Sequence, residues 1–469
     1  MYINIGKMEI EKEEKVMKLE IINFVIKGFR NISSAQIELN DVTAIVGLNG
    51  YGKSNLITAI DFGIEFIKSS PKDKTNQMAY KNGIPLLNKN AGMDYSFEIE
   101  AKYQSLIFKY GYTFSWRTKK NNDNFGIKTE YLRIKETTGS NQYNTYISRN
   151  ERSDNTAFYK SSPTARCTKK LYTEDNELAL NKLLNIDKLF FIEVVKEINE
   201  ISFYIEKHLD SSSSYLPDPF VGKSYDDLSS VKNIPRTIWQ IKSNYSDKYA
   251  ILIDSFKQLF PSIEQIDCKE IKLEIKAPEF TNDVDTMFND YIYTIMVKDN
   301  KMTQPISFDR LSDGTKRVFL SLTFALLAEI KGLSAIVFEE PENSIHPSLL
   351  QAYLRVLHNL SGKCKIIFTS HSPYMIQYLS PEDIYIGLVC KSGQADFRKI
   401  SNSNALIKRA EKEGQLIGEL IFNYISFSNA NEMLEEFIGK PAPDLDLEGE
   451  YNNDDDDWFI DLSDENVEE

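Results

Sequence analysis

The chain has 469 residues, of which 42% are hydrophobic and 26% are charged. This length predicts two or three compact units, because single hydrophobic cores stop growing near ~250–300 residues. No apolar run approaches the ~20 residues that span a membrane, and residues 1–20 lack a signal-peptide core, so we expect a cytoplasmic protein with no membrane contact. The four cysteines form no paired motif, so we expect reduced thiols. The net charge of −14 lies almost entirely in residues 441–469, which leaves the rest nearly neutral.

The first predicted elements are strands and a helix that carry a phosphate-loop motif. Alternating apolar residues predict strands near Lys18–Ile26 and Ala35–Leu39, and Thr43–Val46 predicts a short buried strand. The next residues read G-L-N-G-Y-G-K-S-N and fill the pattern G-x-x-x-x-G-K-[ST], before a predicted helix that continues to about Ile67. This pattern between a strand and a helix predicts a nucleoside triphosphate site.

The phosphate-loop motif gives each of its residues a chemical task. Glycines allow the tight turn that points backbone N–H groups at phosphate oxygens, beside the positive end of a helix. Lys53 is expected to hold the β- and γ-phosphates, and the Ser54 hydroxyl is expected to bind Mg²⁺. The candidate nucleotide-binding residues of this segment are Gly47, Asn49, Gly50, Gly52, Lys53, Ser54 and Asn55.

The middle of the chain predicts an antiparallel β region and then helices. Residues 70–90 are rich in Lys, Asn and Pro and predict a surface loop, whereas period-two alternation over 95–159 predicts an antiparallel meander. Residues 174–209 change to a helical period, which we interpret as a helical arm inserted in the domain. The predicted order is an ATPase segment, a β subdomain, a helical insertion, a second ATPase segment and an acidic tail, with boundaries 1–70, 71–170, 171–260, 261–440 and 441–469.

A second set of motifs follows in the C-terminal half. The sequence L-S-D-G-T-K-R precedes a predicted helix, where Ser312 and Gly314 suit an anion contact, although Ser312 or Asp313 would equally suit a helix cap. An apolar strand then ends in Glu339 and Glu340, and adjacent carboxylates at a strand end suit metal support and water activation.

The last of these motifs ends another apolar strand. Residues 365–368 are followed by T-S-H-S-P, which contains His371. Two of the four histidines, His346 and His371, fall inside motifs, whereas His208 and His358 are expected to be structural.

The order of these motifs resembles that of ABC-type ATPase heads. The phosphate loop, L-S-D-G, E-E-P-E-N-x-x-H-P and T-S-H-S-P occur as in the SMC and RecF heads and, most closely, in the overcoming-lysogenization (OLD) type ATPases of bacterial anti-phage defence. The resemblance implies an α/β P-loop NTPase fold of ABC-ATPase type with an antiparallel β subdomain and an inserted helical arm. It also implies ATP and Mg²⁺ as cofactors. The match covers roughly residues 18–60 and 306–375.

The resemblance also implies a role for each motif residue. Ser312 and Gly314 would bind the γ-phosphate that a second head holds. Glu339 would support Mg²⁺ together with Ser54, although the wider ABC pattern has Asp there. The catalytic set would be Glu340, which polarises the attacking water, His371, which senses the γ-phosphate, and Lys53, with Arg30 as a basic residue near the nucleotide.

The number of motifs in the chain predicts how copies of it assemble, and three biological functions are candidates for the use of ATP. One phosphate loop and one signature per chain predict a head-to-tail homodimer or higher homo-oligomer. The favoured output is control of a separately encoded effector, a nuclease or toxin, in anti-phage defence. The alternative is a RecF- or SMC-like DNA-binding ATPase of repair or maintenance, for which basic runs at 117–120 and 166–170 keep DNA as a candidate partner. A nuclease with its own C-terminal TOPRIM domain is disfavoured, because only 98 residues follow His371.

The acidic tail is the most specific feature outside the ATPase motifs. Residues 441–469 contain 13 acidic residues and no Lys or Arg, which favours a disordered, solubilising segment. The aromatic-aliphatic cluster Trp458–Leu462 also makes the tail a candidate docking segment for a partner.

Overall fold

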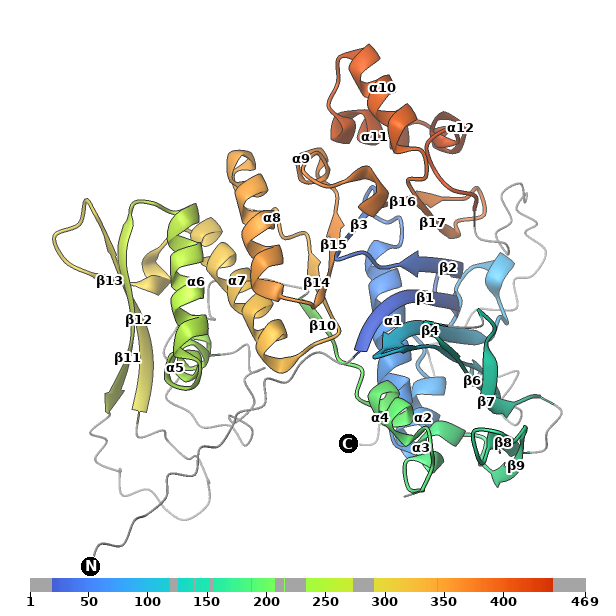
Figure 1. The fold of residues 1–469 in the computed structure, drawn as a ribbon. Coiled ribbons are helices and arrows are strands. Elements are labelled where there is room, and N and C mark those ends of the chain that lie inside the picture. Colours follow the sequence, from blue (N-terminus) through green and yellow to red (C-terminus); the bar gives the residue numbers. More distant parts are fainter. Residues whose placement is uncertain are drawn as a thin grey trace, which may run out of the picture. The chain divides into compact units, whose positions relative to one another are not determined.

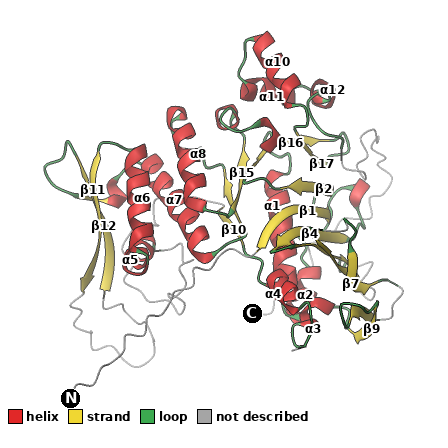
Figure 2. Ribbon diagram, viewed as in Figure 1, coloured by secondary structure: helices red, strands yellow, loops and turns green. Residues whose placement is uncertain are grey.

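The chain folds into two compact units, each containing helices and strands (Figure 2). The computed structural model describes residues 19–118, 125–138, 141–151, 155–186, 188–206, 215, 233–272, 291–343 and 345–441. The first unit combines Met1–Glu20, Ser202–Ile336 and Asn343–Ile366, and the second combines Ile21–Ile201, Val337–Glu342 and Ile367–Glu469. The predicted acidic tail and the basic residues Lys119 and Lys120 lie outside the described residues.

The larger sheet of the second unit has eight strands in the order β2-β1-β4-β5-β6-β7-β8-β9. Successive pairs from β4 to β9 are antiparallel, as are β1 and β2, so the predicted meander is confirmed. The strands are β1 (Leu19–Phe29), β2 (Ile32–Glu38), β4 (Tyr95–Tyr103), β5 (Leu106–Ser115), β6 (Gly126–Glu136), β7 (Asn144–Arg149), β8 (Thr156–Lys160) and β9 (Cys167–Tyr172).

A second sheet carries the phosphate-loop strand. Its order in the second unit is β14-β15-β3-β16-β17, in which β3 and β16 are parallel and β16 and β17 form an antiparallel hairpin. Within the first unit, β10 (Phe203–Glu206) lies beside the start of β14. The other bounds are β3 (Val42–Val46), β14 (Ala335–Glu339), β15 (Lys365–Ser370), β16 (Ile384–Val389) and β17 (Ala395–Lys399). Residues of β3 and β15 are buried almost throughout, as expected for strands covered on both faces.

Helix α1 (Lys53–Lys68) follows the phosphate loop and packs on the aromatic face of the eight-stranded sheet. The Tyr95 hydroxyl donates a hydrogen bond to Ala59 O at 2.8 Å, and the Tyr112 hydroxyl donates one to Gly63 O at 2.8 Å. A side chain at Gly63 has no room, since an added Cβ would lie 2.2 Å from the Phe97 ring. The close approach of helix and sheet therefore depends on this glycine.

Replacing Gly63 by Ala is expected to destabilise the second unit. Overpacking costs roughly 1–3 kcal/mol, which outweighs the ~1 kcal/mol that Ala gains in helix propensity. Urea unfolding should show the loss, with Glu65→Ala as the control because Glu65 is exposed on the same helix. Equal stability of Gly63→Ala and the unchanged chain would contradict the packing described here.

The prediction of a surface loop at residues 70–90 is wrong in its first part, where helix α2 (Pro71–Met78) forms. Ser70 caps this helix by accepting a hydrogen bond from Asp73 N, and Pro71 occupies its first turn, where no N–H donor is needed. Lys74 is fully buried and donates to Asn181 Oδ1 at 2.9 Å. Burial, partly opposed by the Glu130 carboxylate, lowers the pKa of Lys74 to about 8.

The helices of the predicted insertion divide between the units. Helices α3 (Ala179–Leu183) and α4 (Ile192–Asn199) belong to the second unit. The first unit contains α5 (Ile234–Asn244), α6 (Ser246–Leu259), α7 (Asp313–Lys331), α8 (Pro347–Ser361) and the antiparallel strands β11 (Ile263–Lys272), β12 (Tyr291–Asp299) and β13 (Ile306–Ser307). In this unit α5 packs on β11 and β12, and α6 lies beside α7 and α8 (Figure 1).

The C-terminal part of the second unit is a small helical group. It contains α9 (Pro373–Ile376), α10 (Ser403–Glu413), α11 (Ile417–Ile425) and α12 (Ala430–Leu434). Leu406, Leu420 and Leu434 share one hydrophobic core with Ile384 and Ile386 of β16, so this group packs on the phosphate-loop sheet.

Two further expectations from the sequence can be compared with the structure. All four cysteines are free thiols, and Cys268, Cys364 and Cys390 are buried, as predicted. No helix among the described residues is both long and apolar enough to cross a membrane. The five predicted domain ranges stay a proposal.

Candidate nucleotide site

The phosphate loop connects β3 to α1 through glycines that no other residue would replace easily. Gly50 and Gly52 have φ values of 80° and 86°, in the left-handed region that favours glycine. A Cβ at Gly47 would lie 2.8 Å from Gly387 O, whereas one at Gly50 would meet nothing within 4 Å. The loop is therefore packed at its base and open at its tip.

Helix α1 begins with its backbone donors available. Gly52 provides no side-chain cap, and the first turn contains no acidic residue. The first N–H groups of a helix have no partner inside it and carry partial positive charge. The start of α1, where the Ser54 side chain is exposed, therefore suits an anion such as a phosphate group.

Lys53 is buried in the phosphate loop, with 7% of its surface exposed. Its Nζ donates hydrogen bonds to Gly47 O at 2.8 Å and Leu48 O at 3.1 Å. Burial lowers the pKa of Lys53, and the carboxylates of Glu340, Glu342 and Glu339 oppose this shift. The predicted lysine and the predicted acidic residues therefore lie in one electrostatic cluster.

The ends of three strands meet at this cluster. Gly47 N, after β3, donates to Ser370 O at 3.3 Å, and Glu340 N, after β14, donates to Thr369 O at 2.9 Å. Glu340 Oε1 lies 3.0 Å from His371 Nδ1, although that nitrogen has no aligned hydrogen-bond partner among the described residues. Glu340 has a φ of 49°, an uncommon conformation for a residue with a side chain. The structure thus brings Glu340 and His371, two of the predicted site residues, together at the ends of β14 and β15.

A third carboxylate, which the sequence analysis missed, connects the acidic motif to the phosphate loop. Glu342 is 8% exposed, and its Oε1 accepts a hydrogen bond from Ser370 Oγ at 2.5 Å. Ser370 is also the residue whose carbonyl accepts from Gly47 N. Burial raises the pKa of Glu342, and the Ser370 hydrogen bond partly offsets the rise. The available signal was the third acid in E-E-P-E, to which no task had been given.

Arg30 reaches the helix that follows the loop. Its Nη1 donates to Asn55 Oδ1 at 2.8 Å, and Asn55 Nδ2 donates to Asn31 Oδ1 at 2.7 Å. Asn31, also missed from the sequence, therefore orients Asn55. Asn49 lies exposed in the loop.

Ser312 and Gly314 lie at the start of α7 in the first unit, whereas Lys53, Glu340 and His371 belong to the second unit. Ser312 Oγ accepts a hydrogen bond from Thr315 N at 3.3 Å, which is the helix-cap alternative considered from the sequence. His346 caps α8 in the same way, since its Nδ1 accepts from Ser348 N at 3.3 Å.

Comparison with protein families identifies the family of the chain. Residues 42–376 match the family described as "AAA domain, putative AbiEii toxin, Type IV TA system". The chain belongs to this family. The match confirms the predicted P-loop AAA-family ATPase, and the structure confirms the predicted mixed α/β fold with an antiparallel sheet.

Solved structures give weak similarities to this AAA-domain chain. The SMC head domain from Thermotoga maritima is 15% identical, with 80% of this chain and 96% of that chain covered and a TM-score of 0.37. An Smc head from Pyrococcus furiosus bound to the C-terminal domain of ScpA is 13% identical, with coverage of 85% and 100% and a TM-score of 0.42. The recombination mediator RecF is 13% identical, with coverage of 81% and 98% and a TM-score of 0.37. No curated protein matched the chain.

Membership in an AAA-domain family implies a nucleotide and Mg²⁺, and the residues present fit both. The open tip at Gly50 and the uncapped start of α1 suit phosphate oxygens. A hydroxyl at Ser54 and carboxylates at the end of β14 are oxygen donors of the kind that Mg²⁺ prefers.

Proposed function

We propose that this ATPase is a switch that binds and hydrolyses ATP, dimerises head to tail around it, and controls a separately encoded effector in bacterial anti-phage defence. The observation that carries the proposal is the cluster of Lys53, Glu340 and His371 at the joined ends of β3, β14 and β15. A phosphate-loop lysine that holds the β- and γ-phosphates and a residue that orients the attacking water are recurring parts of phosphoryl-transfer sites, and Lys53 and Glu340 suit these two parts.

Each residue of the cluster has a proposed task. Lys53 would leave the Gly47 and Leu48 carbonyls to hold the β- and γ-phosphates. Glu340 would orient the attacking water and accept its proton, and His371, 3.0 Å away, would hold the Glu340 carboxylate in place and contact the γ-phosphate. Bound Mg²⁺ would neutralise charge on the phosphates, with Ser54 and Glu339 as the residues that hold it.

Arg30, Asn49 and Asn55 would complete the nucleotide contacts of one chain. Ser312 and Gly314 would contact the nucleotide of a second chain, so the site would be completed only in the dimer. The family description names a putative toxin of a toxin–antitoxin system, and such a system has two components, which supports a separately encoded partner. That this partner is a nuclease or toxin rests on the resemblance to the OLD-type ATPases.

The dimer can be tested with Glu340→Gln, which is designed to keep ATP bound. Light scattering of this variant is expected to show a monomer without ATP and a dimer with ATP. Adding Ser312→Arg should abolish the dimer but keep ATP binding, because Ser312 would act only on the partner's nucleotide. A Glu340→Gln chain that is saturated with ATP and still monomeric would contradict the proposal.

The effector can be sought by pull-down with Glu340→Gln in the presence of ATP. The unchanged chain without ATP serves as the control. Capture of the product of an adjacent gene is expected. Capture of DNA alone, with affinity that falls steeply with salt, would instead favour the RecF-like alternative.

A further inference from the structure

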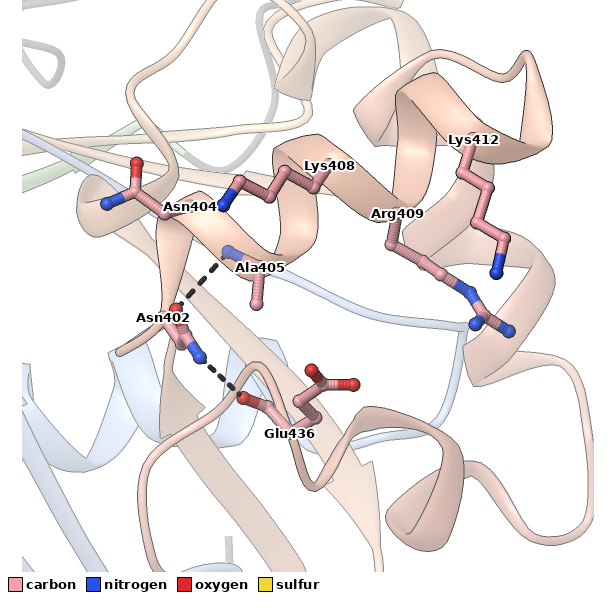
Figure 3. A pocket seen from close by; sticks show the side chains of 7 residues that line it. All are labelled: Asn402, Asn404, Ala405, Lys408, Arg409, Lys412 and Glu436. Atoms are coloured by element: carbon pink, nitrogen blue, oxygen red, sulfur yellow. Dashed lines mark hydrogen bonds between the residues drawn. The ribbon is translucent and has the colours of Figure 1, made fainter.

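The C-terminal helical group carries a basic pocket that is separate from the phosphate-loop cluster. It has a volume of about 410 Å³ and lies between α10 and the loop that contains Glu436. Lys408, Arg409 and Lys412 of α10 line it, together with the Asn402 and Asn404 amides (Figure 3). Because Arg409 is paired with Glu413, the positive charge of the pocket comes from Lys408 and Lys412, against the carboxylate of Glu436.

Two of these cations have no partner in the part of the chain that the structure describes. Arg409 pairs with Glu413 at 2.5 Å and donates to the Tyr424 hydroxyl at 3.0 Å. Lys408 and Lys412 make no such contact within the described ranges, and both are exposed. They are four residues apart on a helix, so they face the same way with Cβ atoms roughly 5–6 Å apart.

The described chain ends beside this pocket. Asn402 N donates to Phe437 O at 3.1 Å, Asn402 Nδ2 donates to Glu436 O at 3.4 Å, and Gly439 N donates to Lys399 O at 2.8 Å. These bonds fix residues 436–439 against the start of α10. The acidic segment that follows Pro441 therefore begins next to the pocket, where its effective concentration is high.

The first acidic residues of the tail match the spacing of the two lysines. Asp444, Asp446, Glu448 and Glu450 alternate with other residues. In an extended chain such alternate side chains share one side and are roughly 6–7 Å apart. Residues 442–450 can span roughly 30 Å, which exceeds the ~16 Å length of the 11-residue α10. The later run Asp454–Asp457 lacks this alternation.

We propose that residues 444–450 bind the basic pocket of their own chain, with their carboxylates on Lys408 and Lys412. Three cations are fewer than the 6–10 phosphate contacts typical of strong nucleic-acid binding, which favours the tethered acidic segment. The bound tail would keep other polyanions out of the pocket. This inference does not depend on the proposed ATP switch.

Carbodiimide coupling of the full chain tests the proposal, because it joins carboxylates only to lysines in direct contact. Mass spectrometry is expected to find Lys408 or Lys412 joined to residues 444–450 at least ~5-fold more often than Lys391, an exposed lysine of the same unit. The yield should fall at 0.5 M salt, where the Debye length is only about 4 Å. Yields no higher than for Lys391 would overturn the proposal. The same coupling can be carried out on a mixture of ¹⁵N-labelled and unlabelled chains. Cross-links between a labelled and an unlabelled chain would also overturn the proposal, since the tail would then bind a second copy.

A binding experiment gives an independent readout. The full-length variant Asp444→Asn, Asp446→Asn, Glu448→Gln, Glu450→Gln should bind a fluorescent peptide of residues 441–453 at least ~10-fold more tightly than the unchanged chain does. Adding Lys408→Glu and Lys412→Glu should abolish this binding, whereas adding Lys391→Glu should not. Equal binding by the neutralised and unchanged chains would overturn the proposal. The proposal would also be overturned if a single-stranded oligonucleotide bound the neutralised and unchanged chains equally and if this binding required Lys408 and Lys412. The pocket would then be a nucleic-acid site.

Discussion

Glu340→Gln is expected to lower the rate of ATP hydrolysis by roughly 10²–10⁴-fold, the range typical for loss of a general base. Gln keeps the size of Glu340 and can keep the bond from its backbone N to Thr369 O, but it cannot accept a proton from water. Nucleotide affinity should stay within about twofold, because Lys53 and the start of α1 are unchanged. Steady-state phosphate release and fluorescent-nucleotide binding measure the two effects separately.

The control for this prediction is Glu435→Gln, which makes the same chemical change at an exposed residue of the same unit. Its turnover should equal that of the unchanged chain. If Glu340→Gln keeps more than a tenth of the turnover, the catalytic role of Glu340 is wrong. If it loses nucleotide binding instead, Glu340 helps to form the phosphate loop and is not a base.

Because the backbone at Glu340 is left-handed, a second variant can separate the effect on activity from the effect on stability. A residue with a side chain in this conformation costs of order 1–3 kcal/mol, whereas Gly adopts it freely and loses ~0.5–1 kcal/mol through chain entropy. Glu340→Gly should therefore be inactive but more stable than the unchanged chain by about 1 kcal/mol. Such strain agrees with the catalytic role proposed for Glu340.

Much of the nucleotide cluster could be predicted because its residues lie inside contiguous motifs. The glycines around Lys53 form one loop, and Glu340 and His371 each follow an apolar strand directly, so local patterns indicated the elements and the ends that carry them. The contact between Glu342 and Ser370 could not be predicted, because it joins residues 28 positions apart and depends on the alignment of β14 with β15. Asn31 was missed for the same reason, since its bond to Asn55 crosses from the β1–β2 turn to α1.

The error at α2 has a local cause. Lys, Asn and Gln make residues 71–78 polar, and overall polarity was interpreted as a loop. The stronger signals were Ser70 as a cap, Pro71 in the first turn and Asp73 at the positive end of the helix. The buried position of Lys74 could not be predicted, because a lysine normally stays exposed unless distant carbonyl and amide oxygens receive its charge.

Glu130→Ala is expected to reduce the free energy of unfolding by about 3–5 kcal/mol, because three buried donors lose their acceptor and each unsatisfied donor costs about 1–3 kcal/mol. Glu130 of β6 is 1% exposed and accepts hydrogen bonds from Ala179 N at 2.6 Å, Leu180 N at 2.9 Å and the Tyr110 hydroxyl at 3.0 Å. Helix α3 has no side-chain cap of its own, so Glu130 caps it from the sheet. Alanine would leave these buried donors unsatisfied and would remove a carboxylate whose charge favours the protonated Arg149 guanidinium.

The control for Glu130→Ala is Glu177→Ala, which removes a carboxylate that pairs with Lys182 at 2.8 Å on a partly exposed surface. Such a pair is worth at most ~1 kcal/mol. Urea unfolding of both variants at pH 7 measures the difference. Equal losses would show that Glu130 does not hold α3 to the sheet.

The contribution of Glu130 to stability is expected to depend on pH. Burial raises the pKa of Glu130 above its ordinary value of 4.5, and the hydrogen bonds from Leu180 N and Ala179 N partly oppose this rise. Between 4.5 and the raised value, the folded chain keeps a proton that the unfolded chain has released. The stability that Glu130 contributes is therefore complete below pH 4.5 and decreases as the pH rises through this window. Glu130→Gln cannot titrate, so the stability of the unchanged chain relative to this variant should fall with rising pH. A difference that rises instead would mean that the three donors stabilise the carboxylate by more than its desolvation costs.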